Sequence, residues 1–274
     1  MGSSFLITLR EGLEASLILA ILITYLNKTG RKEDSRNVWL GAGSAIVACL
    51  VAGTLIYVFV NGLSGKVEQA VEGSIATAAV IVLTQMVFWM RANAKELSAD
   101  LRSKVDASQR QALFVIAFVA VVREGLETVL FLLGAETSTA KGSSVVIGGL
   151  LGLVASVILG VFVFVGGRRV NMKQFFNVTA VLLLLFGAGL AGKAAHEFRE
   201  LLGFESGWLI ASAWNVESGM WSSGTFYDFV KGLFGWVASP ERVRVIAYFL
   251  YLIPVIRFYR RKPNEPAVEV AQVA

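Results

Sequence analysis

The hydrophobic positions of this 274-residue chain fall in long runs with few charges, and short polar connections separate the runs. A helix that crosses the roughly 30 Å hydrocarbon core of a bilayer needs about 20 mostly apolar residues. The pattern therefore predicts an all-α integral membrane protein with seven transmembrane helices. The expected helices span residues 3 to 27, 38 to 61, 68 to 91, 111 to 135, 145 to 167, 174 to 195 and 244 to 260.

The composition supports a membrane protein, since 55% of the residues are hydrophobic and only 16% are charged. An average soluble domain has about 25% charged residues. We expect one polytopic membrane domain over residues 1–262, with a long outer connection at 196–243 and a disordered cytoplasmic tail at 263–274. The single cysteine, Cys49, argues against a disulfide framework and against a cysteine-based metal site.

The basic residues indicate the orientation of the helices, because Lys and Arg accumulate in cytoplasmic loops. They gather in the first, third and fifth connections and in the tail, for example at Lys28, Arg36, Arg102, Arg168 and Arg260. This distribution places the N-terminus outside and the C-terminus inside. The sequence pI near 9.4 then reflects loops that lie near anionic lipid, and it points to no nucleic-acid partner.

One motif, REGLE, occurs twice, at residues 10–14 and 123–127. In the predicted topology the first helix runs inward and the fourth runs outward, so the two copies lie on opposed helices. Each copy begins a unit of three helices, about 3–91 and 111–195, and the seventh helix lies outside both units. Inverted repeats of this kind recur in secondary transporters, whose sites lie where the two halves meet.

Each REGLE motif places two carboxylates on one face of its helix, because residues three apart are neighbours on the helix surface. The arginine of each motif lies four residues before the second acid and is within reach of it. The glycine between them lets a neighbouring helix approach closely. The candidate metal-binding acids are Glu11, Glu14, Glu124 and Glu127, and the supporting charges are Arg10 and Arg123.

The cost of these charges limits where they can lie. At roughly 2.5 to 3.5 kcal/mol each, six such groups facing lipid would cost about 15 to 20 kcal/mol. They must therefore converge on one another, on water or on a bound cation. Two arginines neutralise only two of the four acids, which argues against an alternative in which buried Arg–Glu bridges merely hold the helices together. Four carboxylates form a hard oxygen site that suits iron, manganese, magnesium or calcium.

Four further residues have open interpretations. Glu72, near the start of the third helix, is either a fifth acid of the site or a surface acid that reaches water. Glu68 is either solvated or part of a funnel that leads ions inward. His196 and Glu197 end the sixth helix, where the histidine is either a polar anchor or a metal ligand or proton acceptor near the outer mouth. Lys193 beside them would repel a cation.

The two REGLE motifs, the VLTQMVFWMR run of the third helix and the LAGKAAHEF run of the sixth resemble the high-affinity, oxidase-linked iron permeases, specifically their bacterial ferrous-iron branch. The resemblance extends from Phe5 to about Pro254. It implies that the four REGLE acids bind iron and that Arg10 and Arg123 support them. It also implies a bacterial inner membrane location, iron as a transported substrate with no permanent cofactor, and extracytoplasmic partners that oxidise or deliver iron.

Other functions remain open at this point. A transporter of another hard cation such as Mn²⁺ would use the same acids, and so would a membrane-embedded carboxylate-metal enzyme. The di-iron form of such an enzyme normally uses Glu-x-x-His pairs, and neither REGLE helix contains a histidine, so we expect no enzyme. A third alternative is a structural or sensory membrane protein in which the acids only form ion pairs that hold the helices together.

Two connections have their own patterns. The aromatic outer connection predicts one or two interfacial helices, because Trp and Tyr favour the headgroup level. A docking surface for an extracytoplasmic partner is the alternative. Residues 93 to 110 are polar and predict a short, solvated amphipathic helix.

Overall fold

The computed structural model describes residues 2–93, 110–136, 142–166, 172–204 and 206–260. Within these ranges the regular structure is helical, apart from one isolated β-bridge between Ser212 and Glu241. The all-α prediction is therefore confirmed. The predictions for the tail 263–274 and for almost all of the polar stretch at residues 93 to 110 fall outside the described residues.

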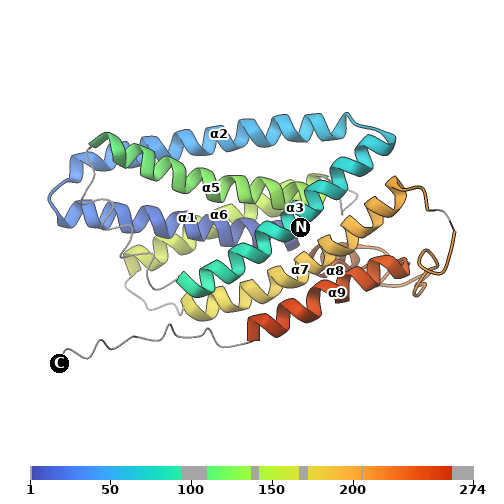
Figure 1. The fold of residues 1–274 in the computed structure, drawn as a ribbon. Helices are drawn as coiled ribbons and strands as arrows, with labels where there is room; N and C mark the ends of the chain where they lie inside the picture. Colours follow the sequence, from blue (N-terminus) through green and yellow to red (C-terminus); the bar gives the residue numbers. More distant parts are fainter. Residues whose placement is uncertain (1, 94–109, 137–141, 167–171, 205, 261–274) are drawn as a thin grey trace, which may run out of the picture.

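A helix covers each of the seven predicted apolar runs, as far as the run is described (Figure 1). Within the described residues, two shorter helices lie in connections. The elements are α1 Gly2–Lys28, the 3-10 turn η1 Lys32–Asp34, α2 Ser35–Asn61, α3 Gly65–Asn93, α5 Arg110–Glu136, α6 Gly142–Gly166, α7 Met172–Leu201, α8 Thr225–Phe234 and α9 Arg242–Arg260.

In the described part of the chain, four segments are long and apolar enough to cross a membrane, namely Lys32–Asn61, Lys66–Ala92, Val145–Phe162 and Gln174–Leu201. Helices α1 and α5 carry the REGLE charges, and α9 carries four arginines, which lowers their apolar character. Helices α2 and α6 expose long apolar faces, on which Leu50 is 64% exposed and Ile158 is 62% exposed. Such faces suit contact with lipid and not with water, as expected of a membrane protein.

Helix α1 packs mainly on α6. The hydroxyl of Thr8 donates a hydrogen bond of 2.8 Å to the carbonyl of Gly149, which fixes one end of the contact. Small residues then let the two backbones stay close. The contacts follow the same chain order on both helices, from Thr8 with Gly152, through Gly12 with Ser156, to Ser16 with Gly160. Helices α1 and α6 are therefore parallel.

Helix α2 packs on α5 in the same manner. The contacts again follow the chain order on both helices, from Gly41 with Ala117, through Cys49 with Gly125, to Gly53 with Val129. Helices α2 and α5 are therefore parallel. Because α1 and α2 run in opposite directions (Figure 1), α1 and α5 are antiparallel.

This pairing interlocks the helices of the two predicted three-helix units. The first helix of each unit packs on the second helix of the other, while α3 packs on α7 and α1 touches α5. A buried apolar cluster joins α1, α3, α5 and α7, and its members include Ile7, Leu83, Phe131 and Leu184. The acids of α1 and α5 are thus enclosed by helices from both units.

The outer connection forms one helix in its described part, α8, which packs on α7 and α1. Gly235 ends α8 with a left-handed backbone (φ 69°) and lies directly against Gly189 of α7. The indole rings of Trp214 and Trp236 stack at 5.3 Å between centroids. The connection is therefore folded against the bundle, and its expected place at the lipid headgroups stays a prediction.

Candidate metal centre

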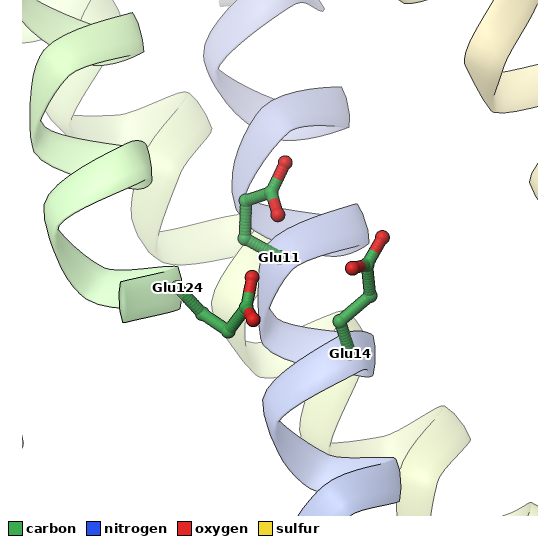
Figure 2. A group of neighbouring side chains, drawn as sticks. All are labelled: Glu11, Glu14 and Glu124. Atoms are coloured by element: carbon green, nitrogen blue, oxygen red, sulfur yellow. The ribbon is translucent and has the colours of Figure 1, made fainter. Parts of the chain in front are cut away.

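Three acids from two helices converge between α1 and α5. Helical spacing places Glu11 and Glu14 on one face of α1, and Glu124 extends from α5 toward them (Figure 2). One carboxylate oxygen of each lies within 4.8 Å of the others. Their exposures are 1%, 7% and 5%, so all three are buried. The antiparallel contact of α1 with α5 brings the two motifs together, a point that the sequence left open.

The arginine of the first motif lies inside the protein. Arg10 is 2% exposed, and its two terminal nitrogens contact Oε1 of Glu11 at 2.9 Å and Oε1 of Glu14 at 2.8 Å. The nitrogen that contacts Glu11 also donates a hydrogen bond of 3.0 Å to the sulfur of Met86 on α3. One guanidinium therefore joins both α1 acids to a thioether of a third helix.

The arginine of the second motif is placed differently. Arg123 is 46% exposed, and its Nε contacts Oε1 of Glu127 at 3.0 Å and Oε1 of Glu124 at 4.0 Å. Its guanidinium lies over the ring of Trp89 on α3, 4.8 Å from the centroid. The fourth acid, Glu127, is thus bound by Arg123 and stands beside the trio of converging oxygens. The two motifs have the same sequence but different surroundings.

Several carboxylate oxygens of the centre are buried without a hydrogen-bond partner among the described residues. They belong to Glu11 (Oε2), Glu124 (Oε2) and Glu127 (Oε2). A buried charged oxygen without a partner costs free energy unless a cation or hydrogen-bond donor approaches it. The two arginines leave two of the four acids uncompensated. The donor set is mainly carboxylate, and it fits a hard divalent cation.

The glycine of each motif lies at a helix contact, as the sequence predicted. A Cβ on Gly12 would stand 2.8 Å from Cβ of Ser156 on α6. A Cβ on Gly125 would stand 2.5 Å from the sulfur of Cys49 on α2. Both distances are too short for side chains at these positions. The two glycines therefore let α6 and α2 enclose the REGLE helices from behind.

The other predicted acids lie in a separate cluster between α3 and α7. Glu72 pairs with the 3%-exposed Lys193 side chain at 2.7 Å, and Glu197 lies 3.9 Å from the same ammonium. The rise of an α-helix puts Glu72 about 21 Å along α3 from Met86. In this arrangement Glu72 is not adjacent to the REGLE trio. Lys193, which we expected to repel a cation, is a counter-charge that these two acids share.

His196 belongs to the same end of the bundle. Its Nδ1 lies 3.1 Å from Glu241 before α9, and its Nε2 lies 3.6 Å from Glu200. Arg199 contacts the same Glu241 at 2.8 Å. Glu68 is partly buried in the first turn of α3. A pathway role for Glu68, Glu72, His196 and Glu197 stays a prediction.

Two side chains near the REGLE charges were not identified from the sequence. Met86 and Trp89 lie three residues apart, on one face of α3, and each contacts one motif arginine. The VLTQMVFWMR run contains both, but apolar residues in an apolar helix give no signal of a polar partner. The packing of α3 against the REGLE helices would have to be known first.

Comparison with known proteins gives a consistent result. The sequence matches the iron permease FTR1 family over residues 1–258. It is 35% identical to the ferrous iron permease EfeU of Yersinia pestis, over 96% of this chain and 94% of that protein. It is 34% identical to the proteins of the same name from Shigella sonnei and Escherichia coli O157:H7, over 96% of each chain. No solved structure matches.

The names of these relatives describe permeases and not enzymes, in agreement with the absence of an enzyme assignment from the sequence. The match covers both REGLE motifs and all of the helices that surround them. The chain therefore belongs to the iron permease FTR1 family of membrane transporters.

Proposed function

We propose that this protein moves iron ions, Fe²⁺ or Fe³⁺, across the bacterial inner membrane into the cell through the paired REGLE carboxylates. The observation that carries the proposal is the buried convergence of Glu11, Glu14 and Glu124 from two opposed helices. Within this trio, the unpartnered oxygens of Glu11 and Glu124 offer a cation the ligands that it loses with its hydration shell. Family membership supports iron as the cation.

We also propose seven membrane crossings, with two inverted three-helix units, an added α9 and the N-terminus outside. The antiparallel α1 and α5 support the inverted units, and so do the matching contacts of α1 with α6 and of α2 with α5. If the two units exchange places, the α1–α6 contact becomes the α5–α2 contact, and the α1–α5 contact is unchanged. The acids then lie where the units meet, as in other transporters built on repeats.

The charges of the centre balance binding against release. An entering dication is attracted by the uncompensated acids, and it repels the guanidinium of Arg10 from Glu11 and Glu14. The return of Arg10 to these acids then displaces the ion. An inside-negative potential favours inward movement by about 2.3 kcal/mol per elementary charge per 100 mV.

The interlocked packing decides which parts can move. A rocking motion of one three-helix unit against the other would slide α1 along α6 and α2 along α5, where the backbones are closest. Tightly packed interfaces resist such sliding. We therefore expect α1 with α6, and α2 with α5, to move as pairs and to open the α1–α5 contact on alternate sides.

The α3–α7 cluster provides further polar groups toward the predicted outer end. We propose Glu68, Glu72, His196 and Glu197 as positions along the path of the ion, and the aromatic outer connection as a place for extracytoplasmic proteins that oxidise or deliver iron. An ion at Glu72 would have to compete with Lys193, which lies 2.7 Å away.

The test is uptake of radioactive iron into proteoliposomes with an imposed inside-negative potential, measured separately for Fe²⁺ and Fe³⁺. Glu14→Gln and Glu124→Gln should each abolish uptake, because each removes a charge from the convergent trio. Glu217→Gln changes an exposed acid of the outer connection and is the matched control.

Unchanged iron uptake by both Glu14→Gln and Glu124→Gln would overturn the proposed role of these acids in transport. Competition by Mn²⁺ at equal concentration would assign the site to hard divalent cations in general.

A further inference from the structure

The thioether of Met86 lies at the centre but has no role in the iron transport proposed above. Its side chain is 3% exposed and belongs to the buried cluster of α3, α5 and α7. A methionine in such a cluster normally packs against apolar groups alone. This one also accepts a hydrogen bond from Arg10, in direct reach of the REGLE acids.

The position of the Arg10 nitrogen shows where a cation would meet this sulfur. The nitrogen lies 2.9 Å from Oε1 of Glu11 and 3.0 Å from the sulfur of Met86. It is the positive group that an entering dication repels. Once the guanidinium has moved away, its former place is lined by a carboxylate oxygen and a thioether sulfur. A cation there would have both as neighbours.

The two donors differ in chemical preference. Carboxylates suit Mg²⁺, Ca²⁺ and Mn²⁺ as well as iron, so an all-oxygen site discriminates poorly among them. A thioether is a soft ligand that contributes little to a hard ion such as Ca²⁺, Mg²⁺ or Fe³⁺. Iron accepts methionine sulfur in proteins, as the axial ligands of cytochromes show.

We propose that Met86 supplies a thioether ligand to Fe²⁺ at the REGLE centre and thereby sets the preference for Fe²⁺ over Ca²⁺ and Mg²⁺. This inference rests on the proposed iron transport and adds the selectivity against hard divalent cations. It also gives Arg10 a second task, because the guanidinium covers the sulfur whenever no ion is bound.

The chain offers a matched pair of variants for the test. Met86→Leu removes the sulfur and nearly conserves the side-chain volume, which buried sites tolerate well. Met90→Leu makes the same change one turn further along α3, where the side chain packs on the apolar cluster. Both purified variants are compared with the wild type in anaerobic Fe²⁺ uptake, with Ca²⁺ or Mg²⁺ as competitor.

We expect Met86→Leu to weaken Fe²⁺ affinity about 10-fold and to leave the affinities for Ca²⁺ and Mg²⁺ unchanged. Met90→Leu should behave like the wild type. X-ray absorption of the Fe²⁺-loaded wild type should show a sulfur neighbour of the iron, and this measurement does not depend on any variant folding.

An unchanged ratio of Fe²⁺ to Ca²⁺ affinity in Met86→Leu would overturn the inference, as would an iron shell of oxygen and nitrogen alone. Glu14→Gln, measured in parallel, separates the two proposals. If Glu14→Gln loses uptake while Met86→Leu keeps its selectivity, the acids carry iron and the sulfur has no part. If Glu14→Gln transports normally, the proposed function itself fails.

Discussion

Gly125 of α5 lies so close to Cys49 of α2 that a Cβ on the glycine would stand 2.5 Å from the cysteine sulfur. The contact lies behind Glu124, on the side of α5 that faces α2. The position of that carboxylate therefore depends on the absence of a side chain at Gly125 and on the small side chain of Cys49.

Gly125→Ala should destabilise the protein by about 1 to 3 kcal/mol, because the added methyl group overpacks the α2–α5 contact. Thermal unfolding in detergent measures the loss. Gly43→Ala is the control, since a Cβ at Gly43 meets no atom within 4 Å. Cys49→Gly in the Gly125→Ala background should restore part of the stability, and no restoration would refute the contact.

Arg10→Gln should destabilise the ion-free protein by about 3 to 5 kcal/mol, because it leaves Glu11 and Glu14 buried without their cation. Arg123→Gln should cost much less, since Arg123 is half exposed. Thermal unfolding with and without Mn²⁺ measures both effects.

The added ion should stabilise Arg10→Gln more than the wild type, because the ion takes the place of the missing charge. Arg10→Gln should also bind iron more tightly and release it more slowly in uptake assays. Equal losses of stability in the two arginine variants would contradict the difference in burial between the two motifs.

Lys193→Met should destabilise the α3–α7 contact strongly, because it leaves Glu72 and Glu197 side by side without their shared counter-charge. Glu72→Gln alone should also destabilise, since it leaves the 3%-exposed Lys193 side chain without its 2.7 Å partner. The free energy of unfolding lost in the double variant should be smaller than the sum of the losses in the two single variants, by about 0.5 to 3 kcal/mol. Additive losses in the unfolding experiment would show that the pair is not coupled.

The orientation can be checked by labelling single cysteines in a Cys49→Ala background. Lys32→Cys, in the connection before α2, should react only with reagents that reach the cytoplasmic side. Met220→Cys, exposed in the connection between α7 and α9, should react from the outside. Labelling of both from one side would exclude the proposed topology.

The helices and the acids of the centre could be predicted from the sequence for simple physical reasons. Apolar runs of membrane length form helices, and buried charges must converge. The distribution of basic residues and the number of helices between the two motifs also predicted the opposed directions of α1 and α5. Nothing in one sequence, however, states which helices touch.

The contact of α3 with the REGLE helices determines the roles of Met86 and Trp89, and the pairing of α1 with α6 and of α2 with α5 determines the enclosure of the acids. The different burial of Arg10 and Arg123 has the same origin. Two identical motifs have no local reason to differ, and only the packing around them makes one arginine a buried bridge and the other a half-exposed one.

The interlocked units have a consequence for the synthesis of the protein. Helix α1 is synthesised well before its main partner α6, which ends at Gly166, so Glu11 and Glu14 are made long before that partner can enclose them. During that interval the guanidinium of Arg10 on the same helix is their available counter-charge. Arg10, for which we propose a part in releasing the ion, would then also protect the nascent chain in the membrane.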